Sequence, residues 1–346
     1  MIRLFSISVL LTLFSGFVAG QDSTKKIKLL PVPTIGYSPE TKTYIGAVTL
    51  FTIDLYKDSL TRTSNAKFEF NYTWNKQLIL ETEWNYFFKE EKWFTKGKIH
   101  YSEYPDYYYG IGSNTPESNK LLFNSNRFVF EANILRNLGG KLFIGPNLRF
   151  INYSNVSYSS DLIYPELADQ FTFGVGITLL RDSRNSLLTP TKGFYFNFNT
   201  GYNFSKSDYV ATTLDIRYYK TWADKYTWAS RMINDFRFGK VPFYDYSFLG
   251  GDKFVRGYNY GRYRDKNLSS IQTEFRLPLV WKFGIATFGG ISNLFANNLK
   301  INDSKYNCGL GLRFLVDKHD KTNLRLDYAV GNDGNSGFYI SFGESF

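Results

Sequence analysis

The residues best suited to chemistry form one short segment, Gly250-Gly251-Asp252-Lys253-Phe254-Val255-Arg256-Gly257-Tyr258. It presents one arginine among glycines, between two stretches of alternating hydrophobicity. A guanidinium group offers five donors in a fixed plane and can bind a carboxylate through two of them. Gly257 permits a tight turn, and Gly250-Gly251 lets the backbone pass close to a wall. The segment therefore suggests an arginine held inside the lumen of a barrel.

Catalytic or metal-binding patterns are weak elsewhere in the sequence. His100 and His319 are isolated, without metal-ligand spacing or an accompanying Ser and Asp pattern. Gly110-Ile111-Gly112 lacks the strand-to-helix context of a phosphate-binding loop. Cys308 is the only cysteine, which excludes an intramolecular disulfide. We expect a protein that is not an enzyme and that holds no cofactor or metal.

The first twenty residues have the pattern of a secretory signal peptide. Arg3 gives a positive start, residues 4–18 are mainly apolar, and Val18-Ala19-Gly20 ends in small residues, so cleavage is expected after Gly20. The chain also has 27 Tyr and 33 Phe, and no later segment approaches the ~20 apolar residues of a membrane helix. Closed β-barrels cross membranes with alternating residues and carry aromatic residues at both interfaces.

Period-two alternation recurs along most of the remaining chain and indicates strands with two different faces. In residues 67–75, Phe68, Phe70, Tyr72 and Trp74 share one face, and polar or charged residues share the other. A soluble sandwich would turn its apolar faces inward. A membrane barrel turns them to lipid and lines its lumen with polar residues. The aromatic apolar faces and charged polar faces favour an all-β transmembrane antiparallel barrel.

Counting these segments predicts sixteen strands, an even number as expected of bacterial barrels. They are expected at residues 29–38, 44–56, 66–75, 77–88, 93–104, 126–137, 141–153, 170–180, 193–203, 208–222, 225–238, 267–278, 282–292, 305–316, 321–331 and 337–346. The longer connections, residues 105–125, 154–169 and 239–266, are expected to be extracellular. Only residues 21–28 precede the first strand, so residues 21–346 are expected to form one barrel domain.

Several blocks of sequence together resemble the BamA/TamA-type (surface-antigen) family of outer-membrane barrels. The blocks are residues 29–33 with 37–41, 104–112, 181–184 with 190–193, 250–251 with 255–258, and 339–346. The resemblance covers nearly the whole chain after residue 20. It implies an integral outer-membrane barrel of a Gram-negative bacterium, a short member without POTRA domains. It also implies that the C-terminal aromatic residues Phe342 and Phe346 form an assembly signal for the barrel-assembly machinery.

The resemblance further implies that the sixth extracellular loop folds into the lumen through Val255, Arg256, Gly257 and Tyr258, where the arginine meets carboxylates on later strands. Family members commonly carry Phe-x-Asp-x-Gly on strand thirteen. This sequence has Phe288-Gly289-Gly290-Ile291-Ser292, with glycine in place of the aspartate.

Arg256 therefore needs other partners or is held less tightly. Asp327, inward-facing by its alternation, and Glu274 are the two candidates. Alternatively, Asp327 is a solitary lumen residue paired only with Arg325.

Larger relatives with POTRA domains insert or secrete proteins and use a weak seam between the first and last strands. The resemblance thus implies a role in translocation or insertion of proteins or lipids. A separate periplasmic protein or lipoprotein is the candidate partner that would replace the POTRA domains. Outer-membrane lipids and lipopolysaccharide are the other expected partners, because a net charge of +10 attracts anionic headgroups. Nucleic acid is not expected, because the basic residues are dispersed among carboxylates.

The main alternative is a passive, porin-like diffusion channel with a mixed-charge lumen. Its lining would include Glu69, Glu81, Glu83, Glu131, Asp215, Arg217, Arg325 and Asp327. A third possibility, a lipid-modifying enzyme, would depend on His100, although nothing near His100 in the sequence marks a nucleophile.

Overall fold

A computed structural model describes residues 27–38, 42–56, 58, 60–74, 76–317 and 322–346. The predicted signal peptide and residues 39–41 of the first block that resembles the family lie outside these residues. Within the described part of the chain, no helix has the length and hydrophobicity of a membrane span.

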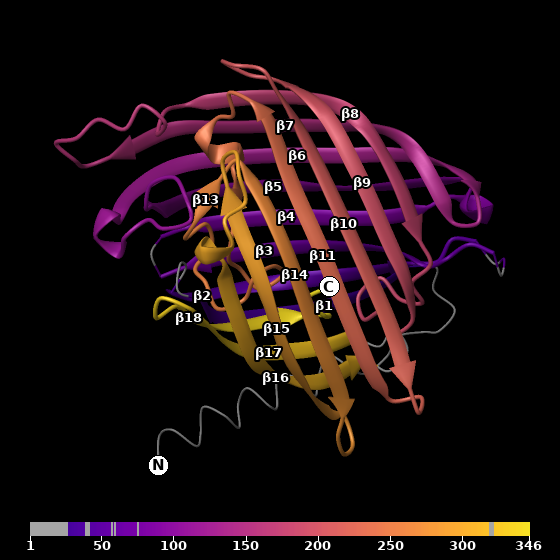
Figure 1. Cartoon of the computed structure of the whole chain (residues 1–346). Helices are drawn as coiled ribbons and strands as arrows, with labels where there is room; N and C mark the ends of the chain where they lie inside the picture. Colours follow the sequence, from indigo (N-terminus) through magenta and orange to yellow (C-terminus); the bar gives the residue numbers. More distant parts are fainter. Residues whose placement is uncertain (1–26, 39–41, 57, 59, 75, 318–321) are drawn as a thin grey trace, which may run out of the picture.

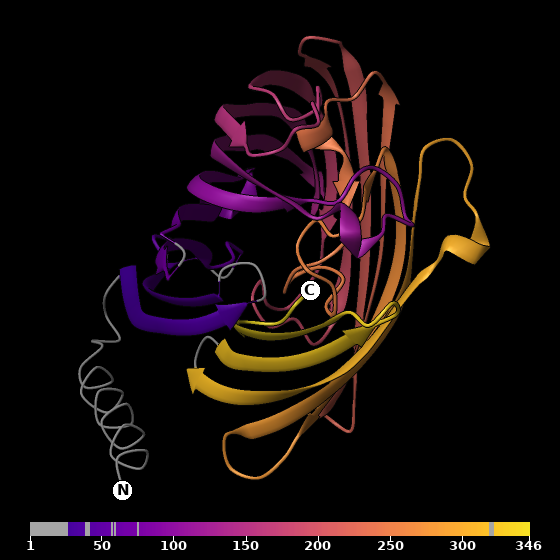
Figure 2. The same cartoon turned by 90° about the vertical axis from the view of Figure 1, so that its left-hand side faces the viewer.

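The described residues form a 16-stranded antiparallel sheet that curls into a barrel (Figures 1 and 2). Its strands follow one another in chain order. They are β1 (Ile27–Ser38), β2 (Lys42–Ile53), β3 (Ser64–Thr73), β4 (Leu78–Phe87), β5 (Trp93–Tyr108), β6 (Leu121–Gly139), β7 (Leu142–Tyr158), β8 (Gln170–Asp182), β9 (Gly193–Phe204), β10 (Tyr209–Trp222), β11 (Tyr226–Gly239), β14 (Asn267–Pro278), β15 (Phe283–Phe295), β16 (Lys305–Asp317), β17 (Thr322–Gly331) and β18 (Ser336–Phe342). The predicted barrel is confirmed, and each predicted strand has its counterpart.

The two faces of the sheet differ as the alternation predicts. On β3, Tyr72 is 52% exposed on the outer face, whereas its neighbour Asn71 is 6% exposed on the inner face. Phe68 and Phe70 also point outward. The barrel thus presents apolar side chains to lipid and polar side chains to the lumen, as a membrane barrel requires.

The largest departures from the predicted strands are at the extracellular end of β5, β6 and β7. β5 reaches Tyr108 and β6 begins at Leu121, so the connection predicted at residues 105–125 shrinks to 109–120. β7 likewise continues to Tyr158. The extended ends of these strands are stabilised because their inward-facing aromatic residues pack into a buried cluster with the long loop after β11. The cluster includes Tyr108, Phe123, Tyr153, Phe243 and Tyr244.

The long loop after β11, residues 240–266, is called loop six here and folds back into the barrel (Figure 2). It contains a short hairpin, β12 (Ser247–Phe248) and β13 (Arg264–Asp265), that the sequence does not predict. Its buried residues Leu249, Val255, Tyr258 and Tyr263 pack against Leu268 and Leu294 of the wall. The predicted insertion of loop six into the lumen is confirmed.

The C-terminal segment departs from the prediction of a strand over residues 337–346. β18 ends at Phe342, and Gly343 takes a left-handed conformation, φ +77°, that turns the chain. The main-chain N–H of Glu344 then donates to the carbonyl oxygen of Leu188 at 2.9 Å. Phe346 is 3% exposed and packs with Tyr219 and Ala229. Residues 343–346 therefore leave the sheet, and we call them the inner tail.

Candidate functional site in the lumen

Arg256, at the tip of loop six, is 1% exposed and contacts three wall residues. Its Nη2 donates to Glu274 Oε2 at 2.6 Å, and its Nη1 donates to Asp327 Oδ2. The guanidinium carbon also lies 3.4 Å from the centre of the Phe288 ring, a cation–π contact. The structure thus brings both candidate carboxylates to the loop arginine, and Asp327 is not paired with Arg325 alone.

The strands position these groups through alternation and through small residues beside them. Glu274 on β14 is opposite Phe288 on β15 in the ladder. Asp327 on β17 is opposite Gly311 on β16. A Cβ atom at Gly311 would collide with the Asp327 carboxylate. The missing side chain therefore leaves room for the ion pair on the inner face.

Gly290 stands where the resemblance leads us to expect aspartate, and the local packing leaves no room for a carboxylate there. A Cβ atom at Gly290 would lie 2.8 Å from Gln272 Cγ and 2.7 Å from the Ile271 oxygen. Two carboxylates on other strands, Glu274 and Asp327, accept from Arg256 instead. The sequence identified both residues but did not indicate that they would bind together.

The contacts of Arg256 belong to a larger group of buried ion pairs. Arg313 donates to Asp327 at 2.6 Å and to Glu344 at 2.8 Å. Arg276 donates to Glu274 at 2.7 Å. Arg325 donates to Asp252 of loop six at 3.1 Å. The set, called the lumen network here, comprises Arg256, Arg276, Arg313, Arg325, Asp252, Glu274, Asp327 and Glu344. Arginines and carboxylates are equal in number, so each desolvated charge has a partner.

The neighbours of Arg256 fix loop six against the last strands. Val255 and Tyr258 are fully buried. The N–H of Gly257 donates to the Tyr339 hydroxyl at 3.0 Å, and the Tyr258 hydroxyl donates to the Tyr306 carbonyl oxygen at 2.6 Å. Arg256, Gly257 and Tyr258 therefore contact residues of β17, β18 and β16, and Val255 belongs to the buried cluster with Leu268 and Leu294.

Loop six also reaches the opposite part of the wall. Lys253 Nζ lies 2.9 Å from Glu83 Oε1 on β4, and this pair is partly exposed. Asp252, the adjacent residue, pairs with Arg325 on β17. The tip of loop six thus joins strands near the two ends of the sheet.

The Ser102 hydroxyl lies beside His100 on β5, a neighbour that we did not predict. The His100 Nδ1 is 3.2 Å from Glu81 Oε2, and its Nε2 is 3.1 Å from the Ser102 hydroxyl. This order of groups resembles a nucleophile with its base. Ser102 is only 3% exposed, however, and Glu81 also pairs with Lys67 at 2.7 Å. The geometry therefore fits a polar lumen network, and the described residues contain no cluster that could hold a metal ion.

Comparisons with known proteins identify the family to which this barrel belongs. The model of the Omp85 superfamily domain matches residues 43–346. The crystal structure of BamA from Haemophilus ducreyi lacking POTRA domains 1-3 is similar with a TM-score of 0.55 and 12% identity, over 92% of this chain and 70% of that chain. CdiB from Acinetobacter baumannii has a TM-score of 0.56 and 14% identity, over 92% of this chain and 60% of that chain. No curated protein sequence matches the chain. The family match and the barrel together establish that this chain belongs to the Omp85 superfamily and is an integral β-barrel protein of the Gram-negative outer membrane.

Proposed function

We propose that this barrel translocates or inserts proteins or lipids at the outer membrane, and that loop six controls the seam between β1 and β18. The observation that carries the proposal is that loop six contacts strands near both ends of the sheet, through Asp252 with Arg325 and Lys253 with Glu83. A loop fixed on both sides can hold the two ends of a sheet together.

The two ends of the sheet are the natural place for such control. The ladder order begins at β1 and ends at β18, and these strands contact each other where the ends of the sheet meet. A strand edge is a template for pairing with another chain. Separation of β1 from β18 would expose two edges, to which a client strand could add by β-augmentation.

A separate periplasmic protein or lipoprotein is the second part of the proposal. The described residues form a barrel, and we assign client reception to another chain. Phe342 and Phe346 are proposed as the assembly signal. Because Phe346 is 3% exposed in the folded barrel, the barrel-assembly machinery would read it before the inner tail is buried.

Affinity purification of the tagged barrel from native membranes after crosslinking tests the partner. We expect a periplasmic protein or lipoprotein in stoichiometric amount, identified by mass spectrometry. Repeated recovery of the barrel alone would contradict the proposal that a separate periplasmic protein or lipoprotein works with it.

A passive channel is distinguished by conductance in planar bilayers. The charged side chains expected to line a channel are largely paired in the structure, for example Glu131 with Lys98 and Asp215 with Arg217. Buried loop six also occupies the lumen. We therefore expect small, intermittent currents. Large and steady currents that are unchanged in Arg256→Ala would favour the channel instead.

A further inference from the structure

We propose that one part of the lumen binds a dianionic phosphate group, either free or as a phosphomonoester, a property independent of client translocation. The residues that would hold the group are called the basic cluster here: Lys96 of β5, Tyr195 and Asn197 of β9, and Arg217 of β10. They face the lumen, because each alternates along its strand with outward residues such as the exposed Tyr218. The basic cluster has more positive charge and more hydrogen-bond donors than the surrounding protein satisfies.

Lys96 crosses the lumen from β5 to β9 and meets only neutral groups there. Its Nζ donates to the Tyr195 hydroxyl and to Asn197 Oδ1, both at 3.1 Å. Its ladder neighbours on β4 and β6 are the neutral residues Asn85 and Asn133. All hydrogen-bond partners of its ammonium group in the described part of the chain are therefore uncharged, and its positive charge is available to an anion.

Arg217 supplies a second positive charge that is only partly offset. It stands directly opposite Arg231 in the ladder of β10 and β11, an arrangement in which like charges repel. The Nη2 atoms of the two arginines donate to the same carboxylate oxygen, Asp215 Oδ2, at 2.6 and 2.9 Å. Lys96, Arg217 and Arg231 thus have one carboxylate among them. The local excess is two positive charges.

The other charged side chains around the basic cluster are paired with one another. Arg184, whose guanidinium carbon lies 4.4 Å from the centre of the Tyr195 ring, binds Asp182 at 2.8 Å. The remaining pairs are Arg62 with Glu91, Lys98 with Glu131, Lys253 with Glu83, and Lys67 with Glu69 and Glu81. Within the ranges that the structure describes, none of these carboxylates pairs with Lys96 or Arg217.

The free hydrogen-bond donors of the basic cluster also suit a phosphate group. Lysine only donates, so Asn197 turns its oxygen to Lys96 and keeps its Nδ2 hydrogens for another acceptor. The Tyr195 hydroxyl accepts from Lys96 and can still donate its own hydrogen. Arg217 uses Nε and Nη2 for Asp215, which leaves Nη1. A phosphate group offers several strong acceptor oxygens, and its charge of about −2 matches the local excess.

An apolar layer lies on the periplasmic side of the basic cluster. Tyr195 packs there with the buried side chains of Phe87, Phe94 and Phe143. Phe94 precedes Lys96 by two residues on the same face of β5, so the layer is one step closer to the periplasmic turns. A layer of this kind excludes water from one side of the cluster, and the attraction between the cations and an anion is stronger as a result.

Isothermal titration calorimetry of the purified full-length barrel in detergent, with inorganic phosphate as the ligand, tests the site. We expect saturable binding at a single site. Glycerol 3-phosphate, a soluble phosphomonoester, should compete with phosphate. Tighter binding of glycerol 3-phosphate would identify an ester as the natural source of the group, and tighter binding of inorganic phosphate would identify the free ion.

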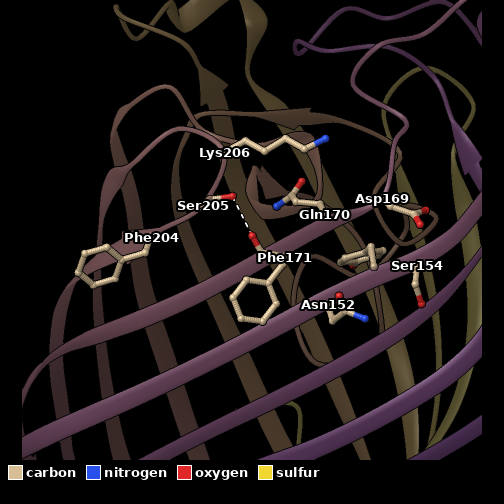
Figure 3. Close-up of a pocket in the computed structure, with 9 residues that line it drawn as sticks. Asn152, Ser154, Asp169, Gln170, Phe171, Phe204, Ser205 and Lys206 are labelled. Atoms are coloured by element: carbon tan, nitrogen blue, oxygen red, sulfur yellow. Dashed lines mark hydrogen bonds between the residues drawn. The ribbon is translucent and has the colours of Figure 1, made fainter.

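Four variants separate binding from damage to the fold. Lys96→Gln and Tyr195→Phe should each weaken phosphate binding several-fold. Asp215→Asn removes the carboxylate that offsets the arginines and should strengthen binding several-fold, an effect that a disturbed fold would not produce. Lys206→Gln is the matched control and should leave binding unchanged. Figure 3 shows Lys206 in the turn beyond the far end of β9, beside a hollow lined by Phe171 and Phe204.

Three outcomes would overturn the proposal. The first is the absence of saturable phosphate binding by the unaltered barrel. The second is equal affinity in Lys96→Gln, Tyr195→Phe and Lys206→Gln, which would mean that phosphate binds elsewhere. The third is stronger competition with phosphate by phosphatidylglycerol, a monoanionic phosphodiester supplied in mixed micelles, than by glycerol 3-phosphate. That result would assign the basic cluster to a lipid headgroup of lower charge.

Discussion

Arg276 of β14 donates a hydrogen bond from Nη2 to the main-chain oxygen of Phe346, at 2.9 Å. The same guanidinium donates to Glu274, which in turn binds Arg256 of loop six. The inner tail and the tip of loop six are therefore connected through two side chains of one strand. Removal of Arg276 should loosen both.

Release of the inner tail can be measured by cysteine labelling. In a Cys308→Ser background, Ser345→Cys should react slowly with a soluble maleimide, because Ser345 is buried. Adding Arg276→Ala should increase the labelling rate at least several-fold. Arg237→Ala is the matched control, since this inward arginine on β11 bonds to Asp245 and not to the tail. Equal rates in the two arginine variants would show that Arg276 does not hold the tail.

Arg256→Ala should destabilise the folded barrel by about 3 kcal/mol, because it leaves two buried carboxylates with fewer partners. Glu274 would keep Arg276, and Asp327 would keep Arg313, so the loss should not be larger. Chemical denaturation in detergent measures the effect. Arg217→Ala provides a comparison, because its carboxylate partner Asp215 retains Arg231. An unchanged denaturation midpoint for Arg256→Ala would contradict the anchoring of loop six.

The strands could be predicted because the membrane and the lumen act on every residue of a barrel strand in the same way. Tyr72 and Asn71 are sorted to opposite faces by polarity alone, without reference to any distant residue. The partners of Arg256 were predictable for the same reason, since Asp327 alternates inward on its own strand.

The inner tail and the β12–β13 hairpin could not be predicted, because distant contacts determine them. Phe346 continues the aromatic pattern of a strand, yet it is stabilised in the lumen by Tyr219 and Ala229. The outer extensions of β5 and β6 likewise depend on packing against loop six. The proximity of Ser102 to His100 is predictable from the sequence, because residues i and i+2 of a strand lie on the same face.

Gly257→Ala should disrupt the docking of loop six through a steric clash. Gly257 has φ +105°, and a Cβ atom there would lie 2.9 Å from the Val330 carbonyl carbon and 3.0 Å from its oxygen. Gly112→Ala isolates the clash from the backbone strain, because Gly112 has φ +119° and open space around its Cβ position. Thermal denaturation should show a clearly larger loss for Gly257→Ala. Equal losses would mean that backbone strain alone explains the effect.

Lys253→Ala should increase opening of the barrel with little change in its stability. Lys253 and Glu83 form a partly exposed pair, so its removal should cost less than about 1 kcal/mol. The pair nevertheless connects loop six to β4, while Asp252 keeps the loop on β17. We therefore expect more frequent openings in planar-bilayer recordings of Lys253→Ala.

Joining the same two positions covalently should have the opposite effect. In a Cys308→Ser background, Lys253→Cys and Glu83→Cys linked by a short bis-maleimide should suppress the openings, and the unlinked double variant serves as the control. Lys206→Ala, a charge removal outside the lumen, should leave the currents unchanged. If currents were the same in the linked and unlinked proteins, loop six would not control the seam, because fixing the loop to β4 would then have no effect on the barrel.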